Sequence, residues 1–164
     1  MTIVSNTGPL IALAKIDRLA VLEQLFGEVS IPPAVQRELL AKSGPETARL
    51  DGALLKFIRV TGIPSLAPEV RIATMRLDVG EQQALALAYE NKMLLMIDDR
   101  LGRAAARRLG LTVTGLVGVL IRAKKAELIQ AVCPLLDEAR QQGYWLSDET
   151  LEVAAKLAGE DRAG

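Results

Sequence analysis

The stretch MLLMIDDR, residues 93–100, decides the fold, because a continuously apolar run ends abruptly there in two aspartates, Asp98 and Asp99. An unbroken apolar run of this length is typical of a strand buried on both faces, as in a parallel sheet covered by helices. Ligands and reactions in open α/β sheets lie at the carboxyl ends of the strands. The stretch therefore predicts a buried parallel strand that presents carboxylates at the edge of a sheet.

A second apolar run, TIV at residues 2–4, gives way just as abruptly to SNTG at residues 5–8. The carboxyl ends of parallel strands meet at one edge of the sheet. We therefore expect Asn6 to share a crevice with Asp98 and Asp99.

Strands and helices alternate along the whole chain. Short strands are predicted at residues 2–4, 28–31, 57–60, 93–97 and 111–113. We therefore expect an α/β fold, a three-layer α/β/α sandwich with a central parallel sheet of four to five strands, plus C-terminal helices. Among the helices, one capped by Asp17 is expected to end at Gly27, and another is expected over about residues 127–142.

Two more acids lie on predicted helices. Glu38 follows the helix start at Pro32-Pro33, and Glu81 lies in the first turn of an alanine-rich helix. That helix and the strand returning from it bring Glu81 and Asp99 to the same edge of the sheet. Oxygen ligands of this kind suit Mg²⁺ or Mn²⁺, which generate hydroxide from water and neutralise charge on a scissile phosphate.

Each of these residues also has a purely structural interpretation. Asp99 can cap the next helix, and Glu81 can favour the dipole of its own helix. Glu38 can be a solvated helix residue, and Asn6 can be a turn former before Gly8. No single one of these residues indicates a site, but their shared position at one edge of the predicted sheet does.

The composition removes several classes of chemistry. The 164 residues include no histidine, which excludes Ser-His triads, imidazole acid–base catalysis and His-ligated zinc. A single cysteine, Cys133, excludes an intrachain disulfide and a Cys-rich metal site, and its apolar setting AVCPLL predicts a buried, inert thiol. Carboxylate, hydroxyl, lysine and hard-metal chemistry remain.

Location and association are also predicted from the composition. The lone cysteine fits a reducing compartment, no apolar run approaches the ~18 residues of a membrane span, and the N-terminus does not resemble a signal peptide. We expect a cytoplasmic protein that makes no membrane contact. A mean hydropathy of +0.23 with few aromatic residues favours a homodimer.

Nucleic-acid binding has to rest on local clusters, because 20 basic and 20 acidic residues give a net charge of zero. Arginines crowd the predicted helix after Asp99, where Arg103 lies one turn along and Arg107 a further turn on the same side. These two can form a stripe that binds phosphates. A solvated helix face with i,i+4 ion pairs is the alternative.

The same residues lie in motifs that follow one another as SNTGPLI (5–11), IPPAVQRE (31–38), LDVGEQQALALA (77–88) and LLMIDDRLGRAAA (94–106). In this order they resemble PIN domains, most closely the bacterial and archaeal subfamily related to VapC-type toxins. The resemblance covers about residues 2–125, so residues 1–125 are expected to form a PIN-like domain. The tail, with GYWLSDE at residues 143–149, resembles that subfamily's C-terminal extension. Residues 126–164 are therefore expected to be a helical extension packed on the same domain.

The resemblance implies a Mg²⁺- or Mn²⁺-dependent endoribonuclease that hydrolyses RNA phosphodiester bonds. It further implies the toxin of a toxin–antitoxin system, with a cognate antitoxin protein as partner. The residues that match the family's acids and carry the catalytic and metal-binding roles are Asn6, Glu38, Glu81 and either Asp99 or its neighbour Asp98. A hydroxyl near the metal falls on Thr7 or Thr114, which we group with Arg103 and Arg107 as substrate-binding residues.

The chain departs from the family's commonest pattern at two positions. Asn6 stands where the first acid is usually Asp, and Glu81 stands where the third is often Asp. An amide oxygen can bind a cation but contributes no negative charge, although Asp98 adds a carboxylate that can compensate. The alternative function is therefore a catalytically degenerate PIN fold that binds nucleic acid or a partner protein. Phosphotransfer on aspartate fits less well, because the first strand ends in Ser-Asn-Thr and no acid lies there.

Overall fold

The computed structural model describes residues 2–63 and 65–162 and has an α/β fold built on an all-parallel sheet. Its strands are β1 (Ile3–Ser5), β2 (Val29–Ile31), β3 (Ile58–Val60), β4 (Leu94–Met96) and β5 (Val113–Thr114). In space they run in the order β3-β2-β1-β4-β5. The expected α/β class, parallel sheet and number of strands are confirmed.

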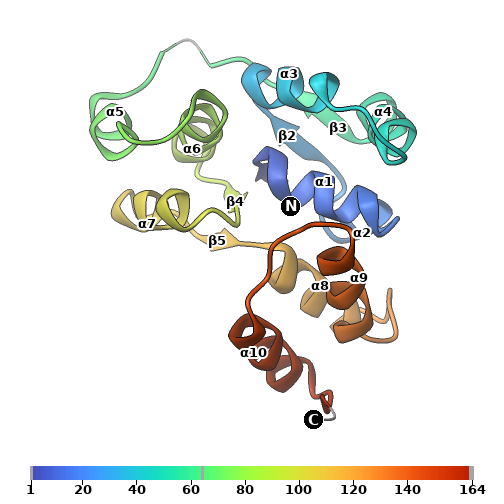
Figure 1. The fold of residues 1–164 in the computed structure, drawn as a ribbon. Helices are drawn as coiled ribbons and strands as arrows, with labels where there is room; N and C mark the ends of the chain where they lie inside the picture. The colour runs from blue at the N-terminus through green and yellow to red at the C-terminus, as the bar shows by residue number, and fades with distance from the viewer. Residues whose placement is uncertain (1, 64, 163–164) are drawn as a thin grey trace.

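Helices connect and follow the strands (Figure 1). They are α1 (Thr7–Lys15), α2 (Ala20–Phe26), α3 (Pro33–Ala41), α4 (Thr47–Lys56), α5 (Pro68–Ala73), α6 (Val79–Asn91), α7 (Arg100–Arg108), α8 (Leu116–Lys125), α9 (Cys133–Gln141) and α10 (Asp148–Ala158). None of the helices between residues 2 and 162 combines the length and the apolarity that a membrane crossing requires.

The strand order reverses between β1 and β4, because β2 and β3 extend the sheet on one side of β1 and β4 and β5 extend it on the other. Ser5 of β1 pairs with Met96 of β4, and Met96 pairs with Thr114 of β5. The residues that follow these three leave the sheet at one edge. Crevices at such a reversal are the usual ligand sites of open parallel sheets.

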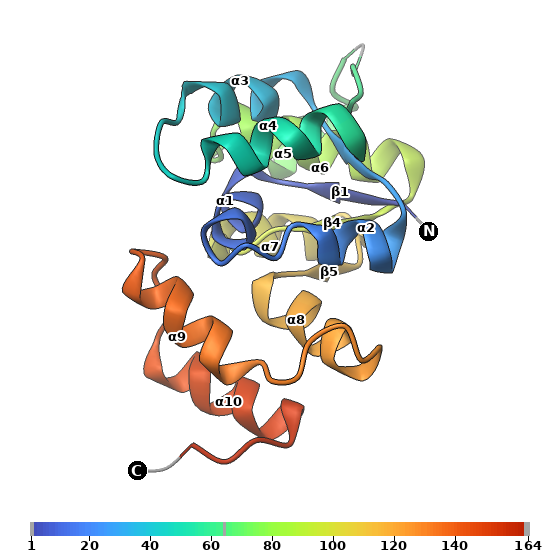
Figure 2. The ribbon, with the colours of Figure 1, turned by 90° about the vertical axis from the view of Figure 1, so that its right-hand side faces the viewer.

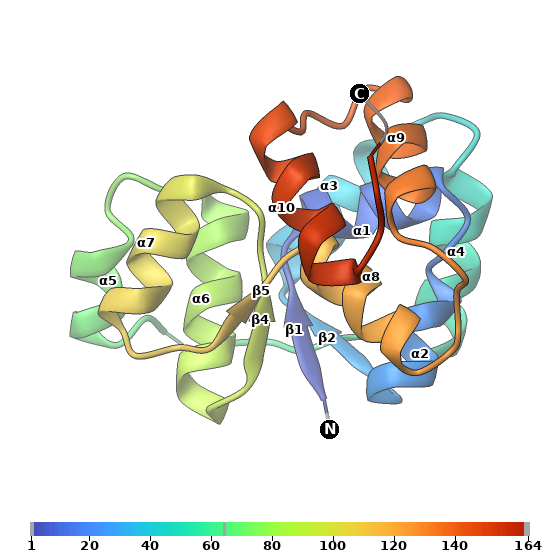
Figure 3. The same ribbon diagram turned by 90° about the horizontal axis from the view of Figure 1, so that it is seen from below.

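Helices cover both faces of the sheet and give the three expected layers. Figure 3 shows α5, α6 and α7 on one side and α1, α8, α9 and α10 on the other, and Figure 2 shows α3 and α4 at one end of the molecule and α9 and α10 at the opposite end. Successive residues of each strand point to opposite faces. In β4, Leu95 packs with α6 and α7, while Leu94 and Met96 pack with the cluster on the opposite face. Both faces are therefore buried, which explains the unbroken apolar run.

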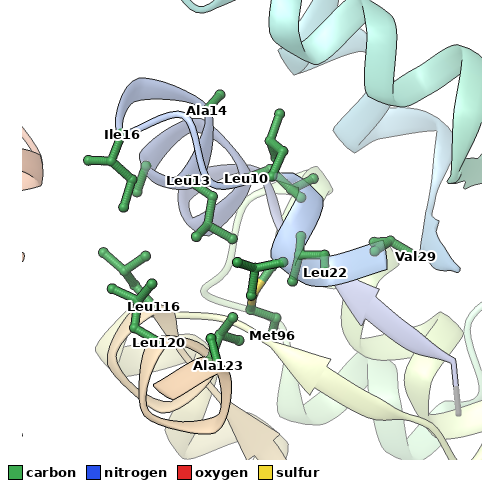
Figure 4. Close-up of a cluster of buried hydrophobic side chains, with 14 of the residues drawn as sticks. Leu10, Leu13, Ala14, Ile16, Leu22, Val29, Met96, Leu116, Leu120 and Ala123 are labelled. Carbon is green, nitrogen blue, oxygen red and sulfur yellow. The ribbon is translucent and has the colours of Figure 1, made fainter. Parts of the chain in front are cut away.

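The larger core cluster lies between the sheet and the two helices α1 and α8 (Figure 4). Leu10 and Leu13 of α1 meet Leu116 and Leu120 of α8 above Met96 of the sheet, and all five side chains are fully buried. Residues of α9 and α10 belong to the same cluster. The C-terminal helices therefore share their core with the sheet.

Three local predictions differ from the structure: the last strand, expected at residues 111–113, is Val113–Thr114, and two helices begin later than expected. Asp17 does not cap a helix: it has a left-handed backbone with φ 55°, and α2 begins later, at Ala20, before ending at Gly27 as expected. The helix expected over residues 127–142 begins only at Cys133, because Glu127 is also left-handed, with φ 62°, and ends the preceding helix. Pro134 then occupies the first turn of α9, where its missing N–H costs nothing.

Candidate active site

The site begins where β1 gives way to α1. The Asn6 N–H donates to the carbonyl of Met96 at 3.0 Å, which ties this turn to the end of β4. The Asn6 side chain is buried, with 8% of the residue exposed. The next residue, Thr7, donates its hydroxyl to Glu38 Oε2 at 2.7 Å. Thr7 thus holds a carboxylate of α3 over the carboxyl edge of the sheet.

Glu38 reaches the first turn of α6 because residue 80 is a glycine. Glu38 Oε1 occupies the space that a Cβ at Gly80 would need. The start of α3 is fixed beside α6 by the Ala34 N–H, which donates to Gln83 Oε1 at 2.9 Å. Sequence reasoning missed Gly80. A glycine in a helix is unfavourable in itself, and that cost is the signal that could have identified a close approach.

Glu81 lies beside Gly80 and forms a capping box with Asp78. The Glu81 N–H donates to Asp78 Oδ1 at 2.8 Å, and the Asp78 N–H donates to Glu81 Oε2 at 3.2 Å. These reciprocal bonds satisfy two donors at the start of α6. The spacing Asp-x-x-Glu is a recognisable capping motif, so Asp78 could have been identified from the sequence.

Glu81 also interacts electrostatically with other predicted site residues. Burial raises the pKa of its carboxyl from an ordinary 4.5 to about 7, although the hydrogen bond with the Asp78 N–H opposes the rise. The negative charges of Asp78, Asp99 and Glu38 raise this pKa further. The carboxylates of α3 and of the end of β4 are therefore near enough to that of Glu81 to disfavour its charged form.

The two aspartates after β4 have different surroundings. Asp99 is exposed and caps α7, where its Oδ2 accepts from the Gly102 N–H at 2.7 Å. Asp98 is half-buried and accepts from the Leu116 N–H, at 3.2 Å from each oxygen, and from the Tyr144 hydroxyl. Protein donors thus hold both oxygens of Asp98, whereas Asp99 retains a side open to solvent.

The predicted substrate-binding residues lie at different distances from the carboxylates. Arg103 lies at the edge, where its Nη1 donates to the Ile97 carbonyl at 3.1 Å and lies 4.0 Å from Asp98 Oδ1. Arg107 is exposed near the end of α7, about 12 Å along the helix axis from Asp99. The Thr114 hydroxyl occupies the space that a Cβ at Gly118 would need, so it faces α8. The structure therefore brings Arg103 and Thr7 to the carboxylates more closely than Arg107 or Thr114.

The donor set fits a hard divalent cation by its chemistry, because it consists of carboxylate and amide oxygens. Among residues 2–63 and 65–162, however, no three Asp, Glu, His or Cys side chains already converge closely enough to hold a metal ion. The carboxylate oxygens instead accept hydrogen bonds from Thr7, the Asp78 N–H and the Gly102 N–H. A cation at this edge would have to replace some of these bonds.

A cavity of about 730 Å³ lies elsewhere, between the end of α8 and the start of α9, and none of the candidate site residues lines it. Cys133 near that region is buried as predicted, and burial together with Glu160 raises the pKa of its thiol. A thiol that resists ionisation is a poor nucleophile.

Comparisons with known proteins agree with this fold. A family profile described as a PIN domain matches residues 2–160, which includes most of the C-terminal extension. A solved PilT N-terminus domain protein from the hyperthermophilic archaeon Sulfolobus solfataricus P2 superposes with a TM-score of 0.58 at 19% identity. The match covers 75% of this chain and 93% of that one. No curated protein matches the chain.

Proposed function

The chain belongs to the PIN-domain family, whose members are typically nucleases, and from this premise we propose that it is a Mg²⁺- or Mn²⁺-dependent endoribonuclease. We further propose that it is the toxin of a toxin–antitoxin pair. The observation that carries the proposal is that Glu38 reaches the first turn of α6 beside Glu81, at the carboxyl edge of the sheet where Asp99 follows β4. Three carboxylates that come together from separate elements are costly unless protons or a cation compensate their charge.

In this proposal Glu38, Glu81 and Asp99 hold the cation, and Asn6 adds a neutral amide oxygen. When bound there, the cation lowers the pKa of a water molecule and offsets negative charge on the scissile phosphate. Asp98 assists without holding the cation, because its carboxylate fixes Arg103 and the start of α8. Thr7 orients Glu38 through its hydroxyl.

RNA contacts are assigned to residues around this edge. Arg103 is held by the Ile97 carbonyl and by Asp98, so its guanidinium is presented in a fixed orientation for a phosphate. Arg107, in the last turn of the same helix, is assigned to a second phosphate. Thr114, whose hydroxyl faces α8, is the remaining residue of this group. Contacts of this kind position an RNA backbone without reading its sequence.

The test uses variants that preserve the helix caps. Glu81→Gln keeps a side chain that completes a capping box, and Asp99→Asn keeps a good N-cap. Each is expected to abolish Mn²⁺-dependent cleavage of single-stranded RNA while the melting temperature stays near that of wild type. Asp51→Asn, which removes an exposed carboxylate on α4, is the matched control and should cleave normally. Wild-type cleavage rates in both site variants would refute the assignment.

A second candidate function is a catalytically degenerate PIN fold that binds nucleic acid or a partner protein. Two observations favour it: the neutral Asn6 at the first acid position and the zero net charge of the chain. Calorimetric titration with Mn²⁺ separates the two functions. A nuclease should show a Mn²⁺ site that Asp99→Asn weakens, whereas a binding module should show no carboxylate-dependent site.

The toxin assignment has its own test, because it concerns a partner and not the chemistry. If the chain is a toxin, the neighbouring reading frame should encode a small protein that copurifies with it and suppresses its cleavage of RNA. Copurification without suppression would leave a nuclease that has a partner of another kind, and would remove the toxin assignment.

A further inference from the structure

The segment between α9 and α10 reaches back from the C-terminal extension to the edge of the sheet that holds the carboxylates. Its Tyr144 packs against the larger core cluster, and the Tyr144 hydroxyl donates a hydrogen bond to Asp98 Oδ2. Gly143, with φ 96°, makes the turn that precedes it, and the Tyr144 N–H donates to the Ala139 carbonyl at 3.0 Å. Both ends of the tyrosine are therefore fixed.

Tyr144 lies over the first turn of α1 as well as over the end of β4. A Cβ placed on Gly8 would lie 3.8 Å from the Tyr144 hydroxyl, which is ordinary van der Waals contact. Gly8 follows directly after Thr7, the residue that holds Glu38. One side chain of the extension thus bridges the two turns that carry the predicted ligands.

Asp98, the partner of Tyr144, connects three further elements. Its oxygens accept from the Leu116 N–H in the first turn of α8, and Arg103 of α7 lies beside it. Its carboxylate also fills the space that a Cβ at Gly115 would need. Asp98 is the direct neighbour of Asp99, so the bonds that fix its carboxylate lie one residue from the side chain that caps α7.

We propose that Tyr144 is a positioning residue of the nuclease site: its hydroxyl fixes Asp98 against the start of α8 and so fixes the β4–α7 turn and Asp99. The C-terminal extension then completes the site, which the sequence alone did not indicate. This inference rests on the proposed nuclease function. Burial, together with the charge of Asp98, raises the pKa of the Tyr144 hydroxyl above its usual range, so the hydroxyl remains a donor.

The test is Tyr144→Phe, which removes the hydroxyl and keeps the ring that packs in the core. We expect kcat for single-stranded RNA with Mn²⁺ to fall by roughly tenfold to a hundredfold, while KM changes less than about twofold. Tyr89→Phe, at the chain's other tyrosine on α6, is the matched control and should leave both constants unchanged. A wild-type or an increased kcat in Tyr144→Phe would overturn the proposal.

A double variant tests whether Tyr144 acts through Asp98. Asp98→Ala, which removes the acceptor, combined with Tyr144→Phe should be no slower than Asp98→Ala alone, because residues that act as a unit are not additive. Additive losses would assign Tyr144 a separate role and overturn the proposal.

A measurement on the metal-free protein separates this proposal from the nuclease function itself. In amide NMR spectra, Tyr144→Phe should shift the N–H signals of Leu116, Asp99 and Gly102, whereas a merely structural role in the extension would leave them in place. If wild type cleaves no RNA but these signals shift, the nuclease function fails and the positioning contact stands. If these signals do not move, the positioning role fails whatever the activity.

Discussion

Gly80 is the residue on which the approach of α3 to α6 depends, because Glu38 Oε1 lies where a side chain would begin. Gly80→Ala should push the Glu38 carboxylate away and break its 2.7 Å hydrogen bond with Thr7. We expect RNA cleavage to fall by roughly tenfold to a hundredfold. Alanine favours the helix by about 1 kcal/mol, and the lost hydrogen bond costs about 1.5–3 kcal/mol. The free energy of unfolding should therefore fall by about 0.5–2 kcal/mol.

Gly52 offers the control for this substitution. It lies on the exposed side of α4, and a Cβ there would meet nothing within 4 Å. Gly52→Ala should therefore raise the free energy of unfolding by up to about 1 kcal/mol and leave cleavage unchanged. Equal cleavage by both alanine variants would mean that the position of Glu38 does not matter to the reaction.

Asn6 is the residue at which this chain departs from its family's usual acid. Asn6→Asp restores a negative charge at the carboxyl edge of the sheet, and the Asn6 side chain makes no capping hydrogen bond that the substitution could remove. We expect Mn²⁺ to bind at least about tenfold more tightly, which corresponds to about 1.4 kcal/mol, when measured by calorimetry. Asn91→Asp, at the far end of α6, is the matched control. Identical affinities in wild type and Asn6→Asp would place Asn6 outside the metal shell.

Among single residues, the sequence predicted the ones whose placement depends on their own strand. Asn6, Asp98 and Asp99 follow buried strands directly, and the register of β1 on β4 brings them to one edge. Contacts across the chain were not predictable in this way. Thr7 and Glu38 are 31 positions apart, and Tyr144 and Asp98 are 46 apart, so no local pattern records either bond.

Among the elements, α9 depends on a single carboxylate at its N-terminus. Glu160, beyond the end of α10, accepts from the N–H groups of Val132 and Cys133 at 2.7 and 2.9 Å and from Lys124 Nζ at 2.9 Å. Burial opposes ionisation of Glu160, but these hydrogen bonds lower its pKa from 4.5 to about 2. The same carboxylate therefore joins α8, α9 and the residues after α10.

Glu160 gives the extension a predictable response to acid. Its folded-state pKa is lower than its unfolded value, so its stabilisation is complete above about pH 4.5 and is lost as the pH falls toward about 2. Thermal melts from pH 6 to pH 2 should show that wild type loses more stability than Glu160→Gln. Parallel pH profiles of the two proteins would show that Glu160 does not stabilise the ionised form.

The sequence predicted elements well where composition and periodicity agree, and poorly where a turn depends on backbone conformation. The alanine-rich α6 and the arginine-rich α7 lie where their caps, Asp78 and Asp99, indicate. The start of α9 was wrong because the left-handed Glu127 has no mark in the sequence: glutamate is a good helix former. Asp17 was wrong for a different reason: aspartate is favoured both as a helix N-cap and in the left-handed region, and here it has positive φ.

For the whole molecule, the predicted homodimer now has a candidate surface. Ile72 in α5 and Met75 just after it are 72% and 73% exposed, on the side of the molecule that α5, α6 and α7 form. Light scattering at micromolar concentration should give twice the chain mass of 17.7 kDa. Ile72→Glu combined with Met75→Glu should give the monomer mass. A monomer mass for wild type would contradict the prediction.

Trp145 follows Tyr144 directly, and 82% of it is exposed to solvent. It is the only tryptophan of the chain, so all indole fluorescence of the protein comes from this one position beside the carboxylate edge. The protein thus contains its own optical reporter, attached to the segment that links the extension to the sheet. An unpaired base that stacks on the indole would quench its emission, so RNA arriving at this rim becomes visible in the metal-free protein without any label.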